Sequence, residues 1–302
     1  MNENQLIMNI SPHIRSKDST NTIMRDVIIA LMPTLVAAGV IYGGRAIAVV
    51  AISVIAAVVS EFLAEKAMQK EVTVRDLSAV VTGILVAYCC PVGIPFWMVA
   101  FGSAVAIVIV KQLFGGLGQN FANPAITARI ILFISFASSM ADWTTGYPDA
   151  IAGSTPLATF DASYMDLFMG NVSGCIGETC KLSLLIGVAY LLIRKVITWH
   201  TPVCFVGAVF LLSAALGSDP VYAILSGGVF LGAFFMATDY VTSPSTKLGR
   251  AIFGIGCGCM TVLIRSFCSY PEGVSFGILL MNILAPHIER LTMAKTFGGE
   301  GK

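Results

Sequence analysis

Two hydroxyl side chains, Ser154 and Thr155, lie in the only long polar loop of an otherwise apolar sequence. Glycine and proline flank them at Gly153 and Pro156, and this composition predicts a turn with exposed hydroxyl groups rather than a helix. On composition alone, residues 149–157 form a surface loop. A chemical role for these hydroxyls depends on which side of a membrane the loop faces.

Amide and hydroxyl groups also gather in two shorter segments. In the first, Asn120 and Asn123 offer amide donors and acceptors beside three glycines that allow close backbone approach. In the second, Thr238 and Asp239 follow an apolar run, at or near membrane depth. Helix capping and tight turns account for either segment alone. Polar clusters at helix ends in opposite halves of a membrane protein also suggest that the two converge on a polar ligand.

Composition places the chain among polytopic membrane proteins. Of its 302 residues, 56% are hydrophobic and only 12% are charged, and the mean hydropathy is +0.84. Soluble domains carry roughly 25% charged residues. Apolar runs of about 17–25 residues are long enough to cross a bilayer as helices. Ten such runs predict ten transmembrane helices, at about residues 24–42, 46–64, 77–91, 95–112, 124–140, 180–197, 201–217, 220–238, 250–267 and 272–288.

The distribution of positive charge predicts the orientation, because short cytoplasmic segments carry an excess of Lys and Arg. If all ten runs cross, fifteen of the 18 Lys and Arg fall on one face, and Arg129, one turn inside the fifth run, is counted with them. Only Arg45, Lys181 and Arg265 fall on the other face. We therefore expect both termini in the cytoplasm and residues 141–179 on the outer side.

Five runs precede this outer loop and five follow it, so the two halves must cross the membrane in opposite directions. We expect an all-α polytopic membrane protein with about ten transmembrane helices in two inverted five-helix halves. Residues 1–302 are expected to form a single integral membrane domain, with halves at about 20–140 and 180–292. Inverted halves of this kind often frame a ligand site near the midplane.

The sequence shows no cysteine or histidine spacing that is typical of a metal or iron–sulfur site. The eight cysteines include no Cys-x-x-Cys pair, and the three histidines form no metal-binding pattern. We expect no metal site, no catalytic residue and no nucleic acid partner. Cys175 and Cys180, on the outer side, could oxidise to a disulfide if the environment allows. Glu61 lies at a cytoplasmic helix end, where it is expected to be an interfacial residue.

Short motifs occur along the chain: Ser-Pro-His at residues 11–13, Ser-Ala-Val-Val-Thr-Gly at 78–83, Gly-Gly-Leu-Gly at 115–118 and Met-Ala-Thr-Asp at 236–239. With the outer loop, they resemble the D subunits of Rnf complexes over nearly the whole length. Rnf complexes are ion-translocating ferredoxin:NAD oxidoreductases. The family is similar to the B subunits of sodium-pumping NADH:quinone reductases, which carry a longer N-terminal extension than the tail of this sequence.

In that family a flavin mononucleotide (FMN) is attached by a phosphoester bond to the last threonine of an Asp-x-x-Ser/Thr-Gly-Ala-Thr motif. The resemblance implies that Thr155 is the attachment residue, because its spacing from the motif aspartate and glycine is kept. The ester would leave the flavin ring free for redox chemistry. The flavin-binding residues implied are Thr155, Asp149, Gly153, Ser154, Pro156 and Leu157.

Two residues of this loop depart from the family pattern. Ala152 stands where the family usually has a hydroxyl residue, and Ser154 stands where it usually has alanine. Ser154 is therefore a second hydroxyl beside the implied acceptor, and Thr159 is a more distant one. Attachment would require a separate flavin transferase and an outward-facing loop.

The resemblance implies electron transfer between ferredoxin and NAD, coupled to sodium or proton translocation, in a bacterial cytoplasmic membrane. Electrons would reach the flavin of this chain from an outer flavin on the G subunit and return toward the C subunit, with the A, B and E subunits as further partners. Because one jump across the bilayer is too long, we hypothesise a second flavin, riboflavin, near Asn120, Asn123, Thr238 and Asp239. The alternatives are a solute channel or transporter of similar helical architecture, which would have a continuous polar pore and no chromophore, and a quinone-reductase B-type subunit.

Overall fold

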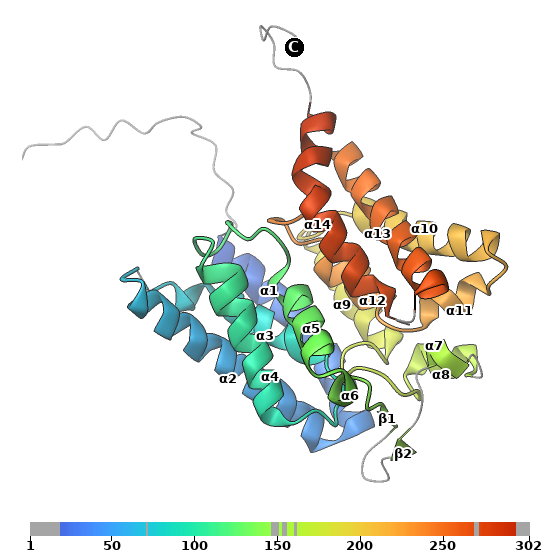
Figure 1. Cartoon of the computed structure of the whole chain (residues 1–302), viewed down its shortest axis with the longest axis horizontal. Helices are drawn as coiled ribbons and strands as arrows, with labels where there is room; N and C mark the ends of the chain where they lie inside the picture. The colour runs from blue at the N-terminus through green and yellow to red at the C-terminus, as the bar shows by residue number, and fades with distance from the viewer. Residues whose placement is uncertain are drawn as a thin grey trace, which may run out of the picture.

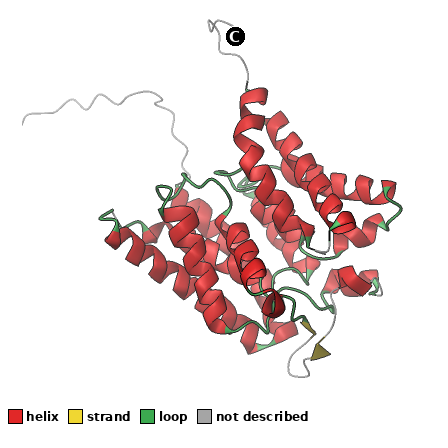
Figure 2. Ribbon diagram, in the orientation of Figure 1, coloured by secondary structure: helices red, strands yellow, loops and turns green. Residues whose placement is uncertain are grey.

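The computed structural model describes residues 19–70, 72–145, 151–152, 156–159, 162–268 and 272–293. Helices dominate these residues, and strand pairing among them is limited to two residues on each side (Figure 2). The helices of the first half, blue to green in Figure 1, stand beside those of the second half, yellow to red. The expected all-α polytopic membrane protein is confirmed.

The first half consists of five main helices. Ser19 caps the first of them by accepting a hydrogen bond from the Thr22 backbone N–H. The fourth continues without a break into a π-helix, η2, and a short 3₁₀ turn, η1 (Val74–Asp76), precedes the third. The bounds are α1 Thr20–Tyr42, α2 Gly44–Ala67, α3 Ser78–Tyr88, α4 Phe96–Val105, η2 Ala106–Gln112 and α5 Pro124–Ser135.

The second half repeats the helical plan with more interruptions. The expected run at 220–238 is broken into two short helices and a π-helix, with Gly227 in the left-handed region between them. The bounds are α9 Lys181–Ile193, α10 His200–Ala215, α11 Pro220–Leu225, α12 Val229–Leu231, η3 Gly232–Met236, α13 Lys247–Phe267 and α14 Gly273–Thr292. The segment between the halves contains α6 Ala137–Met140, β1 Thr144–Thr145, β2 Ile151–Ala152, α7 Pro156–Thr159 and α8 Tyr164–Met169.

Only four of the expected spans are single helices long and apolar enough to cross a membrane among the residues described: α1, α2, α13 and α14. The 11 residues of α3 reach about 16 Å at 1.5 Å per residue, roughly half of a hydrocarbon core. After α3, the chain pairs with the segment that leads into α9: the Ile176 and Gly177 N–H groups donate to the Cys90 and Tyr88 carbonyls. These bonds satisfy backbone groups that no helix covers.

The halves run in opposite directions, as expected. Asp26 near the start of α1 accepts bonds from Arg194 just after the end of α9, and Ala30 contacts Gly187 one to two turns further along. We call the end of the molecule where α1 begins and α14 ends the terminal face (Figure 1). We call the opposite end, with β1, β2 and α8, the loop face (Figure 1).

Candidate functional site

One cavity among the described residues lies between the halves, and its empty space, open mouth included, is about 810 Å³. Its apolar wall includes Leu85, Leu191, Phe234 and Phe235 from three different elements. Its polar wall brings together all four residues that the sequence linked to a second ligand, namely Asn120, Asn123, Thr238 and Asp239. We call this space the central cavity.

The two asparagines of the cavity have different surroundings. Asn123 is the N-cap of α5: its Oδ1 accepts from the Ala125 and Ile126 N–H groups, and its Nδ2 donates to the Met236 carbonyl at 3.2 Å. The Asn120 Oδ1, by contrast, is buried and has no hydrogen-bond partner among the described residues. A buried acceptor without a donor is costly, so Asn120 is the residue with bonding capacity left for a ligand.

Thr238 and Asp239 stand at the end of η3. The Thr238 hydroxyl donates to the Phe234 carbonyl, and the Asp239 carboxylate accepts from the Thr242 hydroxyl and the Val241 N–H. Burial raises the pKa of the Asp239 carboxyl, and the bonds from Thr242 and Val241 oppose that shift. These hydrogen bonds are all made within the same short segment, and Thr238 and Asp239 also line the central cavity.

Sequence reasoning missed a buried ion pair at the same cavity. Lys111 of η2 lines the cavity, is 1% exposed and pairs with Glu61 of α2, which is fully buried. The interfacial position expected for Glu61 is therefore wrong. Its partner lies 50 residues away in the sequence, and only the packing of η2 against α2 brings the two together. Gln112 binds the same Glu61 oxygen at 3.1 Å.

The outer loop is described in part. β1 and β2 pair antiparallel, with Thr144 opposite Ala152 and Thr145 opposite Ile151. Asp149, Gly153, Ser154 and Thr155 lie outside the described residues, as does the Thr159 side chain.

The two residues after Thr155 are held firmly against the second half. The Pro156 carbonyl accepts a bond from the Tyr222 hydroxyl at 2.9 Å, and Leu157 packs against Gly227. A Cβ atom at Gly227 would come within 2.8 Å of Leu157, and its φ of 63° also favours glycine. The segment following Thr155 is thereby fixed at the loop face.

Pro156 also lines a second space of about 310 Å³, which we call the outer crevice. Trp143, Leu167 and the buried Lys181 contribute to its walls. The Lys181 ammonium donates to the Glu178 and Thr179 carbonyls rather than to a carboxylate.

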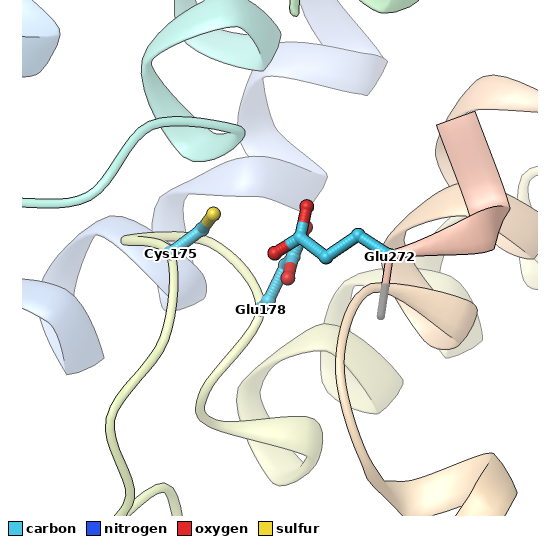
Figure 3. Close-up of side chains that lie close together, drawn as sticks. All are labelled: Cys175, Glu178 and Glu272. Atoms are coloured by element: carbon cyan, nitrogen blue, oxygen red, sulfur yellow. The ribbon is translucent and has the colours of Figure 1, made fainter. Parts of the chain in front are cut away.

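A cluster of charged groups contributes Glu178 and Glu272 to the wall of the outer crevice. The Cys175 thiol and the Glu178 and Glu272 carboxylates converge from two segments (Figure 3), with their ligand atoms within 4.8 Å of one another. Arg129 pairs with both carboxylates and lies 3.4 Å from the thiol. The guanidinium therefore takes the place that a cation would need. We call these four residues the charged junction.

Arg129, counted from the sequence with the charges of the expected cytoplasmic face, is instead buried inside the protein and bound to residues that precede α9 and α14. Cys175 and Cys180 are both free thiols, and the Cys175 Sγ donates to the Cys89 carbonyl. The disulfide considered from the sequence is not formed in this structure.

Comparison with known proteins covers almost the whole chain. The model of the NQR2, RnfD, RnfE family matches residues 7–298. The chain belongs to this family. The D subunit of a Na(+)-translocating ferredoxin:NAD(+) oxidoreductase complex from Acetobacterium woodii is 47% identical over 310 residues, which cover 99% of this chain and 97% of that protein.

Two further relatives are similar over comparable lengths. The D subunit of a proton-translocating ferredoxin:NAD(+) oxidoreductase complex from Clostridium ljungdahlii is 40% identical, over 98% of this chain and 97% of that protein. The D subunit of an ion-translocating oxidoreductase complex from Alcanivorax borkumensis is 34% identical, over 97% of each. The names of the first two relatives differ in the ion that is translocated.

Proposed function

We propose that the chain is the D-type membrane subunit of an ion-translocating ferredoxin:NAD oxidoreductase of the Rnf type. The observation that carries this proposal is the full-length similarity to relatives with that name, at up to 47% identity among the three compared. The A, B, C, E and G subunits are its partners in a bacterial cytoplasmic membrane. Both termini face the cytoplasm, and the loop face is external.

Thr155 carries FMN through a phosphoester bond in this proposal. The spacing of the loop from Asp149 to Thr155 supports it. FMN supplies reversible transfer of electrons when bound, and the chain holds it at the loop face. A flavin transferase makes the ester, and Leu157 and Tyr222 keep the following segment in place.

The central cavity binds a second flavin, riboflavin, without a covalent bond. Its aromatic walls from Phe234 and Phe235 and the unpartnered Asn120 Oδ1 fit a flat, uncharged heterocycle with a hydrogen-bonding edge. The chain thereby holds one redox group at the loop face and one toward the terminal face. Electrons cross the membrane in two shorter steps, and redox change biases helix positions that gate the ion.

The attachment is tested by flavin fluorescence of the denatured protein on a gel, after expression with the flavin transferase. We expect fluorescence from the wild type and from Ser154→Ala, and none from Thr155→Ala. Fluorescence from Thr155→Ala that disappears in Ser154→Ala would move the attachment to Ser154. A dark wild-type band would refute covalent flavin and favour the channel alternative.

The second cofactor is tested by acid extraction of the purified complex, which releases only flavin that is not covalently bound. We expect Asn120→Ala to contain less riboflavin per complex than the wild type, with its covalent fluorescence unchanged. Wild-type complex that yields no riboflavin would refute a second flavin in the central cavity.

A further inference from the structure

A chain of hydrogen bonds leads from the loop after α2, on the terminal face, to the central cavity. The half-buried Asp76 accepts a bond from the Ser78 hydroxyl at 2.5 Å. The Ser78 hydroxyl in turn accepts one from the Lys111 Nζ at 2.5 Å. Ser78 is 5% exposed and Lys111 is 1% exposed, so the two inner members are shielded from water.

Both inner members line the central cavity. A lysine ammonium has three N–H donors, and among the described residues Lys111 uses them for Ser78 and Glu61. One N–H is left for a molecule in the cavity. Lys111 therefore stands between a surface carboxylate and whatever the cavity binds.

The carboxylate that holds Lys111 is itself incompletely bonded. Glu61 Oε1 accepts from Lys111 and Gln112, but its Oε2 is buried with no partner among the described residues. A pair that served stability alone would be expected to satisfy both oxygens, because burying a charge costs free energy unless every lone pair is used. Ionisable groups inside membrane proteins are characteristic of proton relays and ion paths.

The other charged groups near Lys111 are bonded elsewhere. Glu65 accepts from Gln112 at 3.2 Å and from the Thr73 N–H at 3.0 Å. Lys70 donates to the Gln112 carbonyl at 3.1 Å. Asp239, which also lines the cavity, is bound to its own turn. Ser78 is the hydroxyl that connects Lys111 to the surface in the described structure.

We infer that Asp76, Ser78 and Lys111 form a proton path from the terminal face to the central cavity. This inference rests on the proposed second flavin. Reduction of a flavin by two electrons, here from reduced ferredoxin, takes up two protons. For each proton an N–H bond of Lys111 breaks and one forms on the bound flavin.

Lys111 is then reprotonated from the terminal face. Lys111, neutral beside the Glu61 carboxylate, takes a proton from the Ser78 hydroxyl, which takes one from the Asp76 carboxylic acid, itself reloaded from water. The second proton follows by the same route.

The test uses the purified complex and Ser78→Ala, which removes the connecting hydroxyl and keeps the Lys111–Glu61 pair. We expect riboflavin content as in the wild type and a rate of ferredoxin-dependent NAD reduction lower by roughly ten- to a hundredfold, since a positioned proton donor contributes about 10²–10⁴-fold. A small weak acid such as hydrazoic acid, added as azide, restores part of the rate by carrying protons into the cavity. Ser53→Ala, which removes another buried hydroxyl between α2 and α3, is the matched control and keeps the wild-type rate.

A second variant, Asp76→Asn, keeps a carbonyl oxygen for the Ser78 bonds and removes the acid. We expect this variant also to lower the rate of NAD reduction, and we expect azide to restore part of that rate. Wild-type rates in both variants, with riboflavin present, would overturn the proton path and leave the second flavin standing. If azide does not restore the lost rate, the two residues have a structural role, and the proton path would be overturned as well. Wild-type complex without riboflavin would refute the proposed cofactor and the path together.

Discussion

Asn120 and Asn123 are three residues apart, yet they act differently. Asn123→Ala removes the cap of α5 and the bond to the Met236 carbonyl, and is expected to destabilise the protein by about 1–3 kcal/mol. Asn120→Ala removes a buried acceptor that has no partner and is expected not to lower the stability of the protein without bound ligand. Thermal unfolding of the two variants, followed by tryptophan fluorescence, measures this difference. Equal losses of stability would contradict the assignment of the cap to Asn123.

The sequence could predict that Asn120, Asn123, Thr238 and Asp239 lie near one another, but it could not predict which hydrogen bonds each of them makes. Polar groups at the ends of apolar runs are visible as a pattern, and convergence follows once two halves run in opposite directions. Which asparagine caps a helix depends on backbone geometry at Pro124 and on the position of Met236. The Lys111–Glu61 pair was hidden because each residue looks like an ordinary terminal charge of its own apolar run.

Helix α9 packs against α1 through Gly187. A Cβ atom there would lie 2.0 Å from the Ala30 carbonyl oxygen, so Gly187→Ala must push the two helices apart. We expect a loss of about 1–3 kcal/mol, as for other overpacked interiors. Gly207→Ala, inside α10 with nothing within 4 Å of its Cβ, is the matched control. Alanine favours helix at that position, so thermal unfolding of the control should occur at or above the wild-type temperature.

Hydropathy found the positions of the helices better than their lengths. The runs at 77–91 and 124–140 become α3 and α5, of 11 and 12 residues, because the chain turns away before the run ends. A window over apolar residues counts Cys89, Cys90 and Pro91 as membrane-like whether or not they are helical. Their true partners, Cys175–Gly177, are contributed by a distant segment. Pairing of that kind leaves no local signal.

The charged junction joins the two halves of the molecule. Arg129 comes from α5, and its carboxylate partners precede α9 and α14. Arg129→Gln removes the direct ion-pair partner of both carboxylates, while Arg265, which also attracts them, remains. We expect a loss of about 3 kcal/mol in the free energy of unfolding. Adding Glu178→Gln and Glu272→Gln to that variant should recover part of the loss. A triple variant no more stable than Arg129→Gln would contradict this role of the junction.

Orientation in the membrane can be tested with a native thiol. Cys268 is exposed at the end of α13, on the loop face. A maleimide that cannot cross membranes is expected to label it in right-side-out vesicles, and Cys268→Ser should abolish that labelling. Lys195→Cys, on the terminal face, should react only after permeabilisation. The opposite pattern would reverse the proposed orientation.

The central claim for the whole molecule is that a hydroxyl of the outer loop carries a redox group at the loop face. Mass spectrometry of the proteolytic peptide containing residues 149–159, from complex matured with its flavin transferase, tests it most directly. We predict a peptide heavier by one FMN less one water, with fragment ions that place the added mass on Thr155. An unmodified peptide would contradict the claim.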